Sequence, residues 1–499
     1  MTNTDYMNLL SGTDVRGVAI ATDASPVTLT DEAVVNIVKA FCVWAQKKLS
    51  RVPTVAIGYD SRLSSEHIAS LAEEAAVSVG ANAIVTGLSS TPSMFMLLKD
   101  GFGADVSVMI TASHLPFEMN GLKFFTEEGG LESKDVKELL SLAAAGDFPA
   151  GKGTSEKRGY LQKYAGDLVR LVREATGEKT PLQGLKILVD AGNGAGGFYV
   201  NEVLKPLGAN SEGSQFLEPD GRFPNHIPNP ENEEAIHSVC EAVKKHRADF
   251  GIIFDTDVDR AGAVSASGEE INRNRLIALI SAILLREKSG ATIVTDSVTS
   301  DGLTAFIEAN GGVHHRFKRG YKNVINESKR LNAEGIYSPL AIETSGHAAL
   351  KENYFLDDGA YLVTRLLIAL AKAKKEGGTI TDLIADLPEP KEAKEVRLRF
   401  VPNVDFKSLG KQVIDEWREY ALSKSYISPV KNDYEGVRLN FDKAHGDGWL
   451  LLRMSLHEPI LPVNAESNEI GGTKAMWKEL YSFLTRYDFL ALDNLKKLI

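Results

Sequence analysis

The stretch VPTVAIGYDSRLSSEHIASLAEEAAVSVGANAIVTGL, residues 52–88, decides the fold. Its first run, VPTVAIGYD, is rich in β-branched residues, ends in a polar turn and predicts a strand. SSEHIASLAEEAAVSVG follows with apolar residues at helical spacing, and Ser64 or Ser65 is its expected cap. ANAIVTGL reads as the next strand. Strand, helix and strand in this rhythm predict a mostly parallel sheet with helices on its faces.

The same alternation continues along the chain until the PEP sequence at 388–390. Further strands are expected in LKILVDAG, ADFGIIFDTDVDR, ATIVTDSV and SPLAIETSGH, with helices between them. After residue 390 the pattern is that of an α+β piece. We therefore predict an α/β protein in which three mixed-sheet α/β domains and a C-terminal α+β domain surround a central cleft. The expected domains are residues 1–178, 179–273, 274–392 and 393–499.

Composition narrows the class of protein. With 43% apolar and 25% charged residues among 499, the chain resembles an ordinary soluble protein. A net charge of −11 argues against a nucleic acid as partner. The longest apolar run, at 276–285, is too short to span a membrane and predicts a buried helix. The N-terminus lacks the pattern of a secretory signal, and the two cysteines, Cys42 and Cys240, form no disulfide or metal pattern. We expect a cytoplasmic location; the oligomeric state is not readable.

Ser113 lies in TASHLPFEMNGLKFF, residues 111–125, directly after an expected strand. Ligands of open α/β sheets gather at such strand ends. A serine hydroxyl needs a base, a charge or a metal to act as a nucleophile, and His114 and Lys123 are close in sequence. A serine in a turn that caps the next helix is the alternative.

A second strand end carries three carboxylates, Asp255, Asp257 and Asp259, in DTDVDR. Like charges this close raise one another's pKa unless a cation lies among them, and oxygen ligands favour a hard ion such as Mg²⁺. A solvated acidic turn is the alternative. Arg260, next in sequence, can offset the charge or hold an anion.

Two further loops carry polar groups. In ETSGH, Glu343 and Ser345 suit the hydroxyl groups of a sugar, although a capped turn explains them equally well. In RMSLHEP, Arg453 and Ser455 suit a phosphate, although a surface turn is equally consistent.

Together and in this order, the four loops resemble the α-D-phosphohexomutase superfamily. TASHLP, DTDVDR, ETSGH and RMSLHEP are similar to its phosphoserine, metal, sugar and phosphate loops. SGTDVRGVA, GYDSRLSS, VDAGNGAGG and PDGRFPNHIPNPEN are similar to further motifs of that superfamily, so the resemblance covers nearly the whole chain.

The resemblance implies a phosphomutase of the phosphomannomutase/phosphoglucomutase type. Ser113 would carry a phosphoryl group, give it to a hexose phosphate to form a hexose 1,6-bisphosphate, and recover the other phosphate. Mg²⁺ would be held by Ser113, Asp255, Asp257 and Asp259, and the bisphosphate would serve as intermediate and activator. The resemblance assigns catalytic roles to His114, Lys123, Arg16 and His347. It assigns substrate binding to Arg260, Lys318, Arg319, Glu343, Ser345, Arg453, Ser455 and His457.

Several residues depart from the family pattern. Leu115 replaces an asparagine, Ile342 a glycine, and Thr256 and Val258 replace glycines of the metal loop. Val258 can still occupy an extended backbone; if the family's loop needs a positive φ there, this loop must be shaped differently. Leu456 and His457 alter the phosphate loop, where His457 adds a pH dependence. Tyr321 follows Gly320 in an unusually basic segment, with Lys318, Arg319 and Lys322, which suggests an altered substrate preference.

Three alternatives remain. Phosphoglucosamine mutase is the closest, because an amino sugar differs only at C2. A non-catalytic sugar-phosphate binder would keep the fold but would not need a phosphorylatable serine beside a metal site. GIIFDTD also looks like the nucleophile motif of haloacid-dehalogenase-type phosphatases, but Asp259 stands where that motif usually has Thr or Val.

Overall fold

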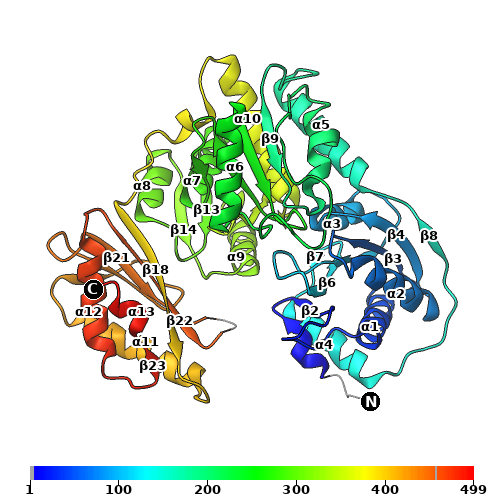
Figure 1. Ribbon diagram of the computed structural model, residues 1–499, viewed down its shortest axis with the longest axis horizontal. Helices are drawn as coiled ribbons and strands as arrows, with labels where there is room; N and C mark the ends of the chain where they lie inside the picture. Colours follow the sequence, from blue (N-terminus) through cyan, green and yellow to red (C-terminus); the bar gives the residue numbers. More distant parts are fainter. Residues whose placement is uncertain (1–4, 456–457) are drawn as a thin grey trace. The chain divides into compact units, whose positions relative to one another are not determined.

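The computed structural model describes residues 5–455 and 458–499, and the chain divides into two compact units (Figure 1). The first unit is Met1–Asn272 with Ser345–Asp382, and the second is Arg273–Thr344 with Leu383–Ile499. The division falls within residues 274–392, which the sequence analysis assigns to one domain. That assignment of four domains stays a prediction.

The first unit begins with a mixed sheet in the order β1-β2-β6-β5-β3-β4-β8, with β7 paired to β6. Strand β3 is parallel to β4 and β5, whereas β6 is antiparallel to β5 and β2. The strands are β1 (Leu10–Ser11), β2 (Asp14–Val18), β3 (Thr54–Tyr59), β4 (Asn82–Leu88), β5 (Val106–Ile110), β6 (Met119–Thr126), β7 (Gly129–Gly130) and β8 (Ser155–Lys157). The helices are η1 (Tyr6–Leu9), α1 (Asp31–Leu49), α2 (Ser65–Ser78), α3 (Thr91–Lys99), α4 (Ser133–Ala145) and α5 (Leu161–Thr176).

Apolar side chains explain why this sheet and its helices fold together. All five residues of β5 are buried, as expected of a central strand covered on both faces. On one face, Phe41 of α1 contacts Phe124 of β6 with ring centroids 4.7 Å apart. Burying such a ring contributes about 1.5–3 kcal/mol. The strand, helix and strand predicted at 52–88 are confirmed, although α2 starts after Ser64 without a side-chain cap bond.

The first unit also contains a sheet in the order β12-β11-β10-β9, in which β9 and β10 are parallel. All five residues of β10 are buried, so the chain enters the metal loop directly from the interior. The elements of this region are β9 (Ile187–Asp190), η2 (Ala195–Gly197), η3 (Tyr199–Leu204), α6 (Glu233–His246), β10 (Phe250–Phe254), β11 (Ala261–Ser265), β12 (Glu270–Ile271), β16 (Ala348–Leu350), η4 (Lys351–Asn353), β17 (Leu356–Asp357) and α10 (Gly359–Lys375).

The second unit begins with three parallel strands in the order β14-β13-β15. Within helix α7, nine of the ten residues of the run 276–285 are buried, as predicted. The elements are α7 (Asn274–Glu287), β13 (Thr292–Thr295), α8 (Asp301–Ala309), β14 (Val313–Arg316), α9 (Tyr321–Ala333) and β15 (Leu340–Ile342). A 3-10 helix, η5 (Ile380–Ile384), contains the boundary between the units.

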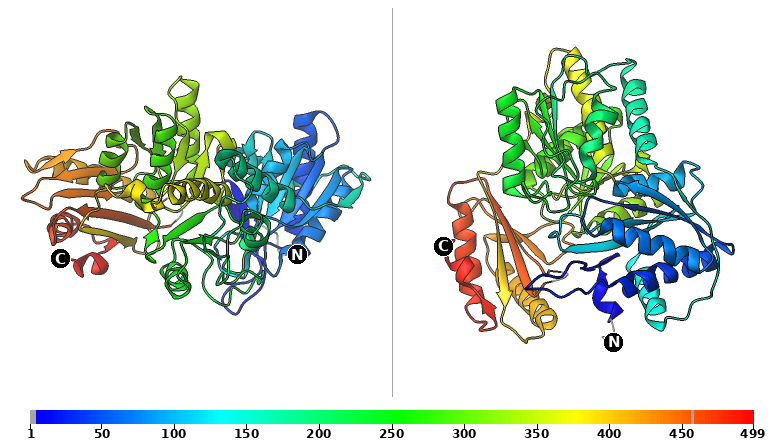
Figure 2. Two further views of the ribbon diagram at one scale, coloured as in Figure 1. Left: turned by 90° about the horizontal axis from the view of Figure 1, so that it is seen from above. Right: turned by 45° about the vertical axis from the view of Figure 1, so that its right-hand side comes forward.

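The C-terminal part of the second unit is an antiparallel sheet in the order β19-β20-β21-β22-β18-β23. Helices α11 and α12 pack on this sheet (Figure 2). Trp417 and Trp477 lie in the core that they share with it. This is the α+β arrangement predicted from the sequence. The elements are β18 (Glu392–Phe400), α11 (Phe406–Leu422), β19 (Ile427–Pro429), β20 (Val437–Phe441), β21 (Gly448–Leu452), β22 (Ile460–Ser467), α12 (Gly472–Leu484), β23 (Leu490–Ala491) and α13 (Asp493–Lys496).

Across residues 5–455 and 458–499, every helix is either too short or too polar to cross a bilayer.

Candidate active site

Ser113 lies in a turn between β5 and β6. Because the next regular element is the strand β6, the alternative of a helix-capping serine is wrong. The backbone of Ser113 has a φ of 51°, in the left-handed region that residues other than glycine seldom adopt. Its N–H donates to Thr111 Oγ1 at 2.8 Å. The turn therefore holds Ser113 in a conformation that an unsupported chain would avoid.

Arg62, in the GYDSR motif, supports this turn. Its guanidinium donates to the backbone carbonyls of Ser113, Leu115, Pro116 and Met119. The side chains of Arg62 and Asp60 are fully buried and lie 3.4 Å apart. The motif was noticed in the sequence, but this role was missed, because nothing in the spacing of GYDSR points to carbonyls some 50 residues away.

The three carboxylates after β10 form a buried cluster. Asp255 and Asp257 are 0% exposed and Asp259 is 4% exposed, so the alternative of a solvated acidic turn is wrong. One ligand oxygen from each lies within 4.8 Å of the other two. Within the described residues, Oδ1 of Asp257 and Oδ1 of Asp259 have no hydrogen-bond partner. Buried acceptors without partners are costly, and a hard divalent cation is the group that three such carboxylates fit. The cluster can bind a metal ion.

Ser113 and the cluster are in direct contact. Ser113 Oγ donates to Asp255 Oδ2 at 3.0 Å. Burial, together with the neighbouring charges of Asp259 and Asp257, raises the pKa of Asp255 well above its ordinary value. The three carboxylates therefore carry the electrostatic conflict that the sequence analysis anticipated.

Lys123 neutralises the other side of the cluster. Its Nζ lies 2.9 Å from Asp257 Oδ2 and 2.6 Å from Asp259 Oδ2. Burial opposes its charge, but the two carboxylates outweigh burial and raise the pKa of the Lys123 ammonium well above its usual value. Thr91, which the sequence analysis missed, donates to Asp257 Oδ2 at 2.5 Å from the first turn of α3. Arg16 pairs with Asp14 at 3.0 Å.

Arg260 joins the cluster to Ser113 and His114. Its Nε donates to Asp255 Oδ2 at 3.1 Å and its Nη2 to Ser113 Oγ at 3.1 Å. Nη2 also contacts Nδ1 of His114. Because a guanidinium only donates, this Nδ1 must accept, so the proton of the neutral ring is on Nε2. Burial and the cations Arg260 and Arg16 lower the pKa of His114 to about 2.

The ETSGH loop is split by the boundary between the units. Ser345 and His347 belong to the first unit, where His347 forms a backbone bridge with Arg260. Burial lowers the pKa of His347 to about 3. Ser345 Oγ is buried and has no hydrogen-bond partner among the described residues. Glu343 belongs to the second unit, where Gly320 N donates to its Oε1 at 2.6 Å.

Val258 does not occupy the extended backbone that the sequence analysis left open to it. Val258 has a φ of 66° and is fully buried. A β-branched residue is an outlier in this region, because its side chain crowds the following carbonyl. The loop therefore keeps a conformation natural for glycine and accepts strain. The packing of the buried valine offsets this strain.

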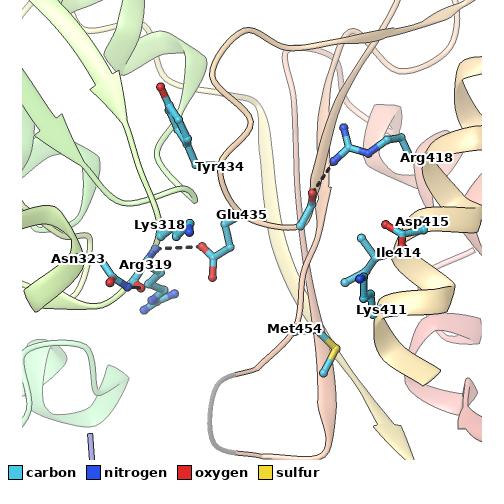
Figure 3. Close-up of a pocket in the computed structure, with 11 residues that line it drawn as sticks. Lys318, Arg319, Asn323, Lys411, Ile414, Asp415, Arg418, Tyr434, Glu435 and Met454 are labelled. Carbon is cyan, nitrogen blue, oxygen red and sulfur yellow. Dashed lines mark hydrogen bonds between the residues drawn. The ribbon is translucent and has the colours of Figure 1, made fainter. Parts of the chain in front are cut away.

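The second unit contains a cavity of about 360 Å³ (Figure 3). Lys318, Arg319 and Glu435 lie on one side of it, and residues of α11 line the other. Glu435 Oε2 accepts from Arg319 N at 3.0 Å, and its Oε1 lies 3.8 Å from Nη1 of Arg453. Glu435 thus connects two of the predicted substrate-binding residues, and the sequence analysis missed it.

The phosphate loop begins where β21 ends. Arg453 is 8% exposed, so a plain surface turn does not describe it. Burial lowers the pKa of its guanidinium, an effect that Glu435 partly offsets. Ser455 Oγ accepts from Glu458 N at 3.2 Å. Leu456 and His457 lie outside the described residues.

Comparisons with known proteins show which proteins this chain is similar to. Family models described as phosphoglucomutase/phosphomannomutase, alpha/beta/alpha domains I, II and III, match residues 8–149, 159–268 and 272–390. A phosphomannomutase/phosphoglucomutase of Pseudomonas putida is 31% identical over 429 residues, which cover 85% of this chain and 86% of that protein. A phosphoglucomutase/phosphomannomutase of Thermococcus kodakarensis is 30% identical over 468 residues, 92% of this chain and 95% of that protein.

A solved structure is similar as well. The crystal structure of a phosphoglucomutase/phosphomannomutase family protein from Burkholderia thailandensis superposes with a TM-score of 0.79 at 25% identity. The superposition covers 96% of this chain and 97% of that one. The three domain models span well over half of the sequence, and the relatives align along most of their own length. The chain belongs to the phosphoglucomutase/phosphomannomutase family, within the α-D-phosphohexomutase superfamily.

Proposed function

We propose that the protein is a phosphohexomutase that interconverts the 1-phosphate and the 6-phosphate of mannose, glucose or both. The observation that carries the proposal is the contact of Ser113 Oγ with Asp255 Oδ2, at 3.0 Å, inside a buried three-carboxylate cluster of a chain from this family. A protein that only binds sugar phosphates does not need a serine hydroxyl in contact with a buried carboxylate cluster.

Ser113 carries the phosphoryl group in this proposal. The sugar hydroxyl forms a new O–P bond while the bond from Ser113 Oγ to phosphorus breaks, which gives a hexose 1,6-bisphosphate. Transfer of the other phosphate back to Ser113 completes the reaction. Arg260, which already contacts Ser113 Oγ, supplies fixed N–H donors to the charge that develops on the phosphoryl oxygens.

Mg²⁺ is the metal we propose for the cluster. Ser113, Asp255, Asp257 and Asp259 would hold it, with the unpartnered oxygens of Asp257 and Asp259 as the strongest indication. When bound, it neutralises negative charge on the transferring group. Lys123 adds a positive charge on the same side of the cluster.

The histidines have different tasks. His114 uses Nδ1 to accept from Arg260, so it orients that guanidinium rather than taking a proton at this atom. His347 is neutral and is our candidate acceptor for the proton of the sugar hydroxyl. The negative charge of a bound sugar phosphate raises the pKa of His347 and makes it a better base.

The predicted substrate-binding residues keep their roles in this proposal. Arg453, Ser455, Lys318, Arg319 and His457 contact phosphate, and Glu343 and Ser345 contact sugar hydroxyls. Guanidinium groups suit this task because they donate to a phosphate in a bidentate manner. We also propose a cytoplasmic location, which fits the two free cysteines Cys42 and Cys240.

The test combines mass spectrometry with a mutase assay. Intact mass and peptide mapping of Ser113 are measured before and after incubation with glucose 1,6-bisphosphate and Mg²⁺. Turnover is then measured with glucose 1-phosphate, mannose 1-phosphate and glucosamine 1-phosphate. Phosphate on Ser113 with turnover of the first two supports the proposal. Preferred turnover of glucosamine 1-phosphate contradicts the substrate assignment, and neither phosphate nor turnover contradicts the mutase.

A further inference from the structure

The segment PDGRFPNHIPNPE, residues 219–231, has no role in the proposed reaction, although the sequence analysis singled it out. We call it the Asn229 loop. A buried pair anchors the loop to the sheet: His226 Nε2 of the loop lies 3.0 Å from Oδ1 of Asp190, at the end of β9. The two side chains are 1% and 0% exposed. Gly192 N and Gln215 Nε2 also donate to Asp190, at 2.9 and 2.6 Å. The base of the loop is therefore fixed by charge-assisted hydrogen bonds in the interior.

Asn193 fixes the first half of the loop. Its side chain donates to the carbonyl of Glu218 at 2.8 Å and accepts from Asn225 Nδ2 at 2.8 Å. Its carbonyl accepts from Asp220 N at 2.9 Å. A loop with this many internal bonds has few alternative conformations, so the side chains near its C-terminal end have defined positions.

Near its C-terminal end the loop contacts Arg260. Asn229 Oδ1 accepts from Arg260 Nη1 at 3.3 Å, and Glu231 Oε2 lies 3.9 Å from the same atom. Asn229 Oδ1 also accepts from Glu231 N at 3.0 Å, which ties the Asn229 side chain to the backbone of Glu231.

With these contacts, each of the three nitrogen atoms of the Arg260 guanidinium has a partner. Arg260 has five N–H groups in a rigid plane. Nε faces Asp255, the Nη1 edge faces Asn229 and Glu231, and Nη2 faces Ser113 Oγ and His114. Because the plane is rigid, fixing the Nη1 edge fixes the direction in which Nη2 points.

The loop also contacts Arg62, the other arginine that bonds to the Ser113 turn. The guanidinium of Arg62 lies 5.3 Å from the ring centroid of Phe223. Arg62 holds the carbonyls of the turn, and Arg260 holds its hydroxyl. One loop therefore touches both groups that place Ser113.

We propose that Asn229 is a positioning residue for phosphoryl transfer: it orients Arg260 so that Nη2 meets the oxygen atoms at Ser113. This inference rests on the proposed mutase function. Among the described residues, the Asn229 side chain bonds to Arg260 and to Glu231 N and not to Ser113 or the carboxylate cluster, so its effect passes through Arg260.

The test uses the full chain, four single variants and one double variant. Asn229→Ala removes the acceptor, and Asn229→Asp keeps an oxygen at its position. Asn82→Ala is the matched control, because Asn82 Oδ1 likewise accepts from a backbone N–H, that of Thr154, in another part of the first unit. Arg260→Lys keeps the positive charge but removes the planar fork. The readouts are kcat and KM for glucose 1-phosphate, the rate of Ser113 phosphorylation by glucose 1,6-bisphosphate followed by intact mass, and Tm.

We expect Asn229→Ala to lower kcat and the phosphorylation rate roughly tenfold, with KM within about twofold. The reason is that Arg260 Nη2 loses its alignment, which matters in the transition state, where charge develops on the phosphoryl oxygens. Asn229→Asp should recover most of this loss, and Asn82→Ala should match the wild type. In the Arg260→Lys background, Asn229→Ala should add no further loss, since both act through one guanidinium.

Three results overturn the inference while the mutase proposal stands. They are wild-type kcat in Asn229→Ala, a loss that Asn229→Asp does not recover, and a loss of the same size in the Arg260→Lys background. A wild-type protein that neither turns over hexose phosphates nor accepts phosphate on Ser113 removes the mutase proposal, and the inference falls with it.

Discussion

Ser113 Oγ lies 3.0 Å from Asp255 Oδ2, although 142 positions of sequence separate the two residues. Each residue follows a fully buried strand, β5 and β10 respectively. The ends of two sheets thus place a hydroxyl against a carboxylate in an interior where electrostatic interactions are strong. This contact makes Ser113, rather than any other serine, the expected carrier of the phosphoryl group.

The first prediction concerns Ser113 itself. Ser113→Ala should abolish turnover and phosphate incorporation while the Tm stays close to that of the wild type, because a single buried hydroxyl is lost. Ser141→Ala is the control, since Ser141 is an exposed serine whose hydroxyl donates to the carbonyl of Lys137. Turnover of Ser113→Ala at the wild-type rate would assign the phosphoryl transfer to another group.

The second prediction concerns the metal. Asp257→Asn keeps the size of the side chain and its acceptor for Thr91, but it removes a charge from the cluster. We expect at least a tenfold weaker affinity for Mn²⁺, measured by calorimetry, and a matching rise in the Mg²⁺ concentration needed for turnover. The same calorimetry on Asp249→Asn, whose carboxylate accepts from Lys186 N, is the control. Equal affinity in Asp257→Asn and the wild type would remove Asp257 from the metal site.

Much of this site was predictable because strand ends and residue types are local features. The runs before Ser113 and Asp255 identify buried strands, and three alternating aspartates indicate a cation site without any structure. The partners of these residues were not predictable. Thr91 reaches Asp257 across 166 positions, and no local pattern marks such a contact.

Backbone conformation was the other limit. The sequence left an extended backbone open to Val258, and β-branched residues prefer that region. Its surroundings override this preference: Val258 N donates to Asp255 O at 3.3 Å, and its carbonyl accepts from Gly359 N at 3.1 Å. The second partner comes from the start of α10, so the φ of Val258 depends on tertiary contacts that the sequence does not display.

The third prediction concerns the phosphate loop. Arg453→Ala should raise KM for glucose 1-phosphate by roughly tenfold or more, with a smaller change in kcat, because a charge-assisted contact to phosphate is lost. Arg453→Lys should recover part of the affinity, since it restores the charge without the bidentate geometry. An unchanged KM in Arg453→Ala would place the phosphate contact on other residues.

The fourth prediction uses the strain at Val258. Alanine is usually more stabilising than glycine, by about 0.5–1 kcal/mol in regular structure. At a φ of 66° this order should reverse, because only glycine escapes the left-handed penalty of about 1–2 kcal/mol. Both Val258→Ala and Val258→Gly lose the buried side chain, so both should have a lower Tm than the wild type, with the glycine variant the more stable of the two. A higher Tm for Val258→Ala would show that the backbone strain is absent.

The last prediction concerns Asp358, which caps α10 far from the carboxylate cluster in sequence. It accepts from Tyr164 OH at 2.6 Å, from Tyr361 N at 2.8 Å and from Asn353 Nδ2 at 2.9 Å. Despite these bonds, burial raises the pKa of Asp358 to about 6, from an ordinary value of 3.8.

The sign of the pH effect follows from proton binding. Between pH 3.8 and about 6 the folded protein binds this proton more tightly than the unfolded chain, so the free energy of unfolding falls as pH rises through that window. In Asp358→Asn the group cannot ionise and this slope disappears. The Tm of Asp358→Asn relative to the wild type, measured by calorimetry from pH 4 to 7, should therefore increase with pH and level off above about 6.5. A difference in Tm that is constant from pH 4 to 7 would mean that Asp358 titrates at the same pH in the folded and unfolded chains.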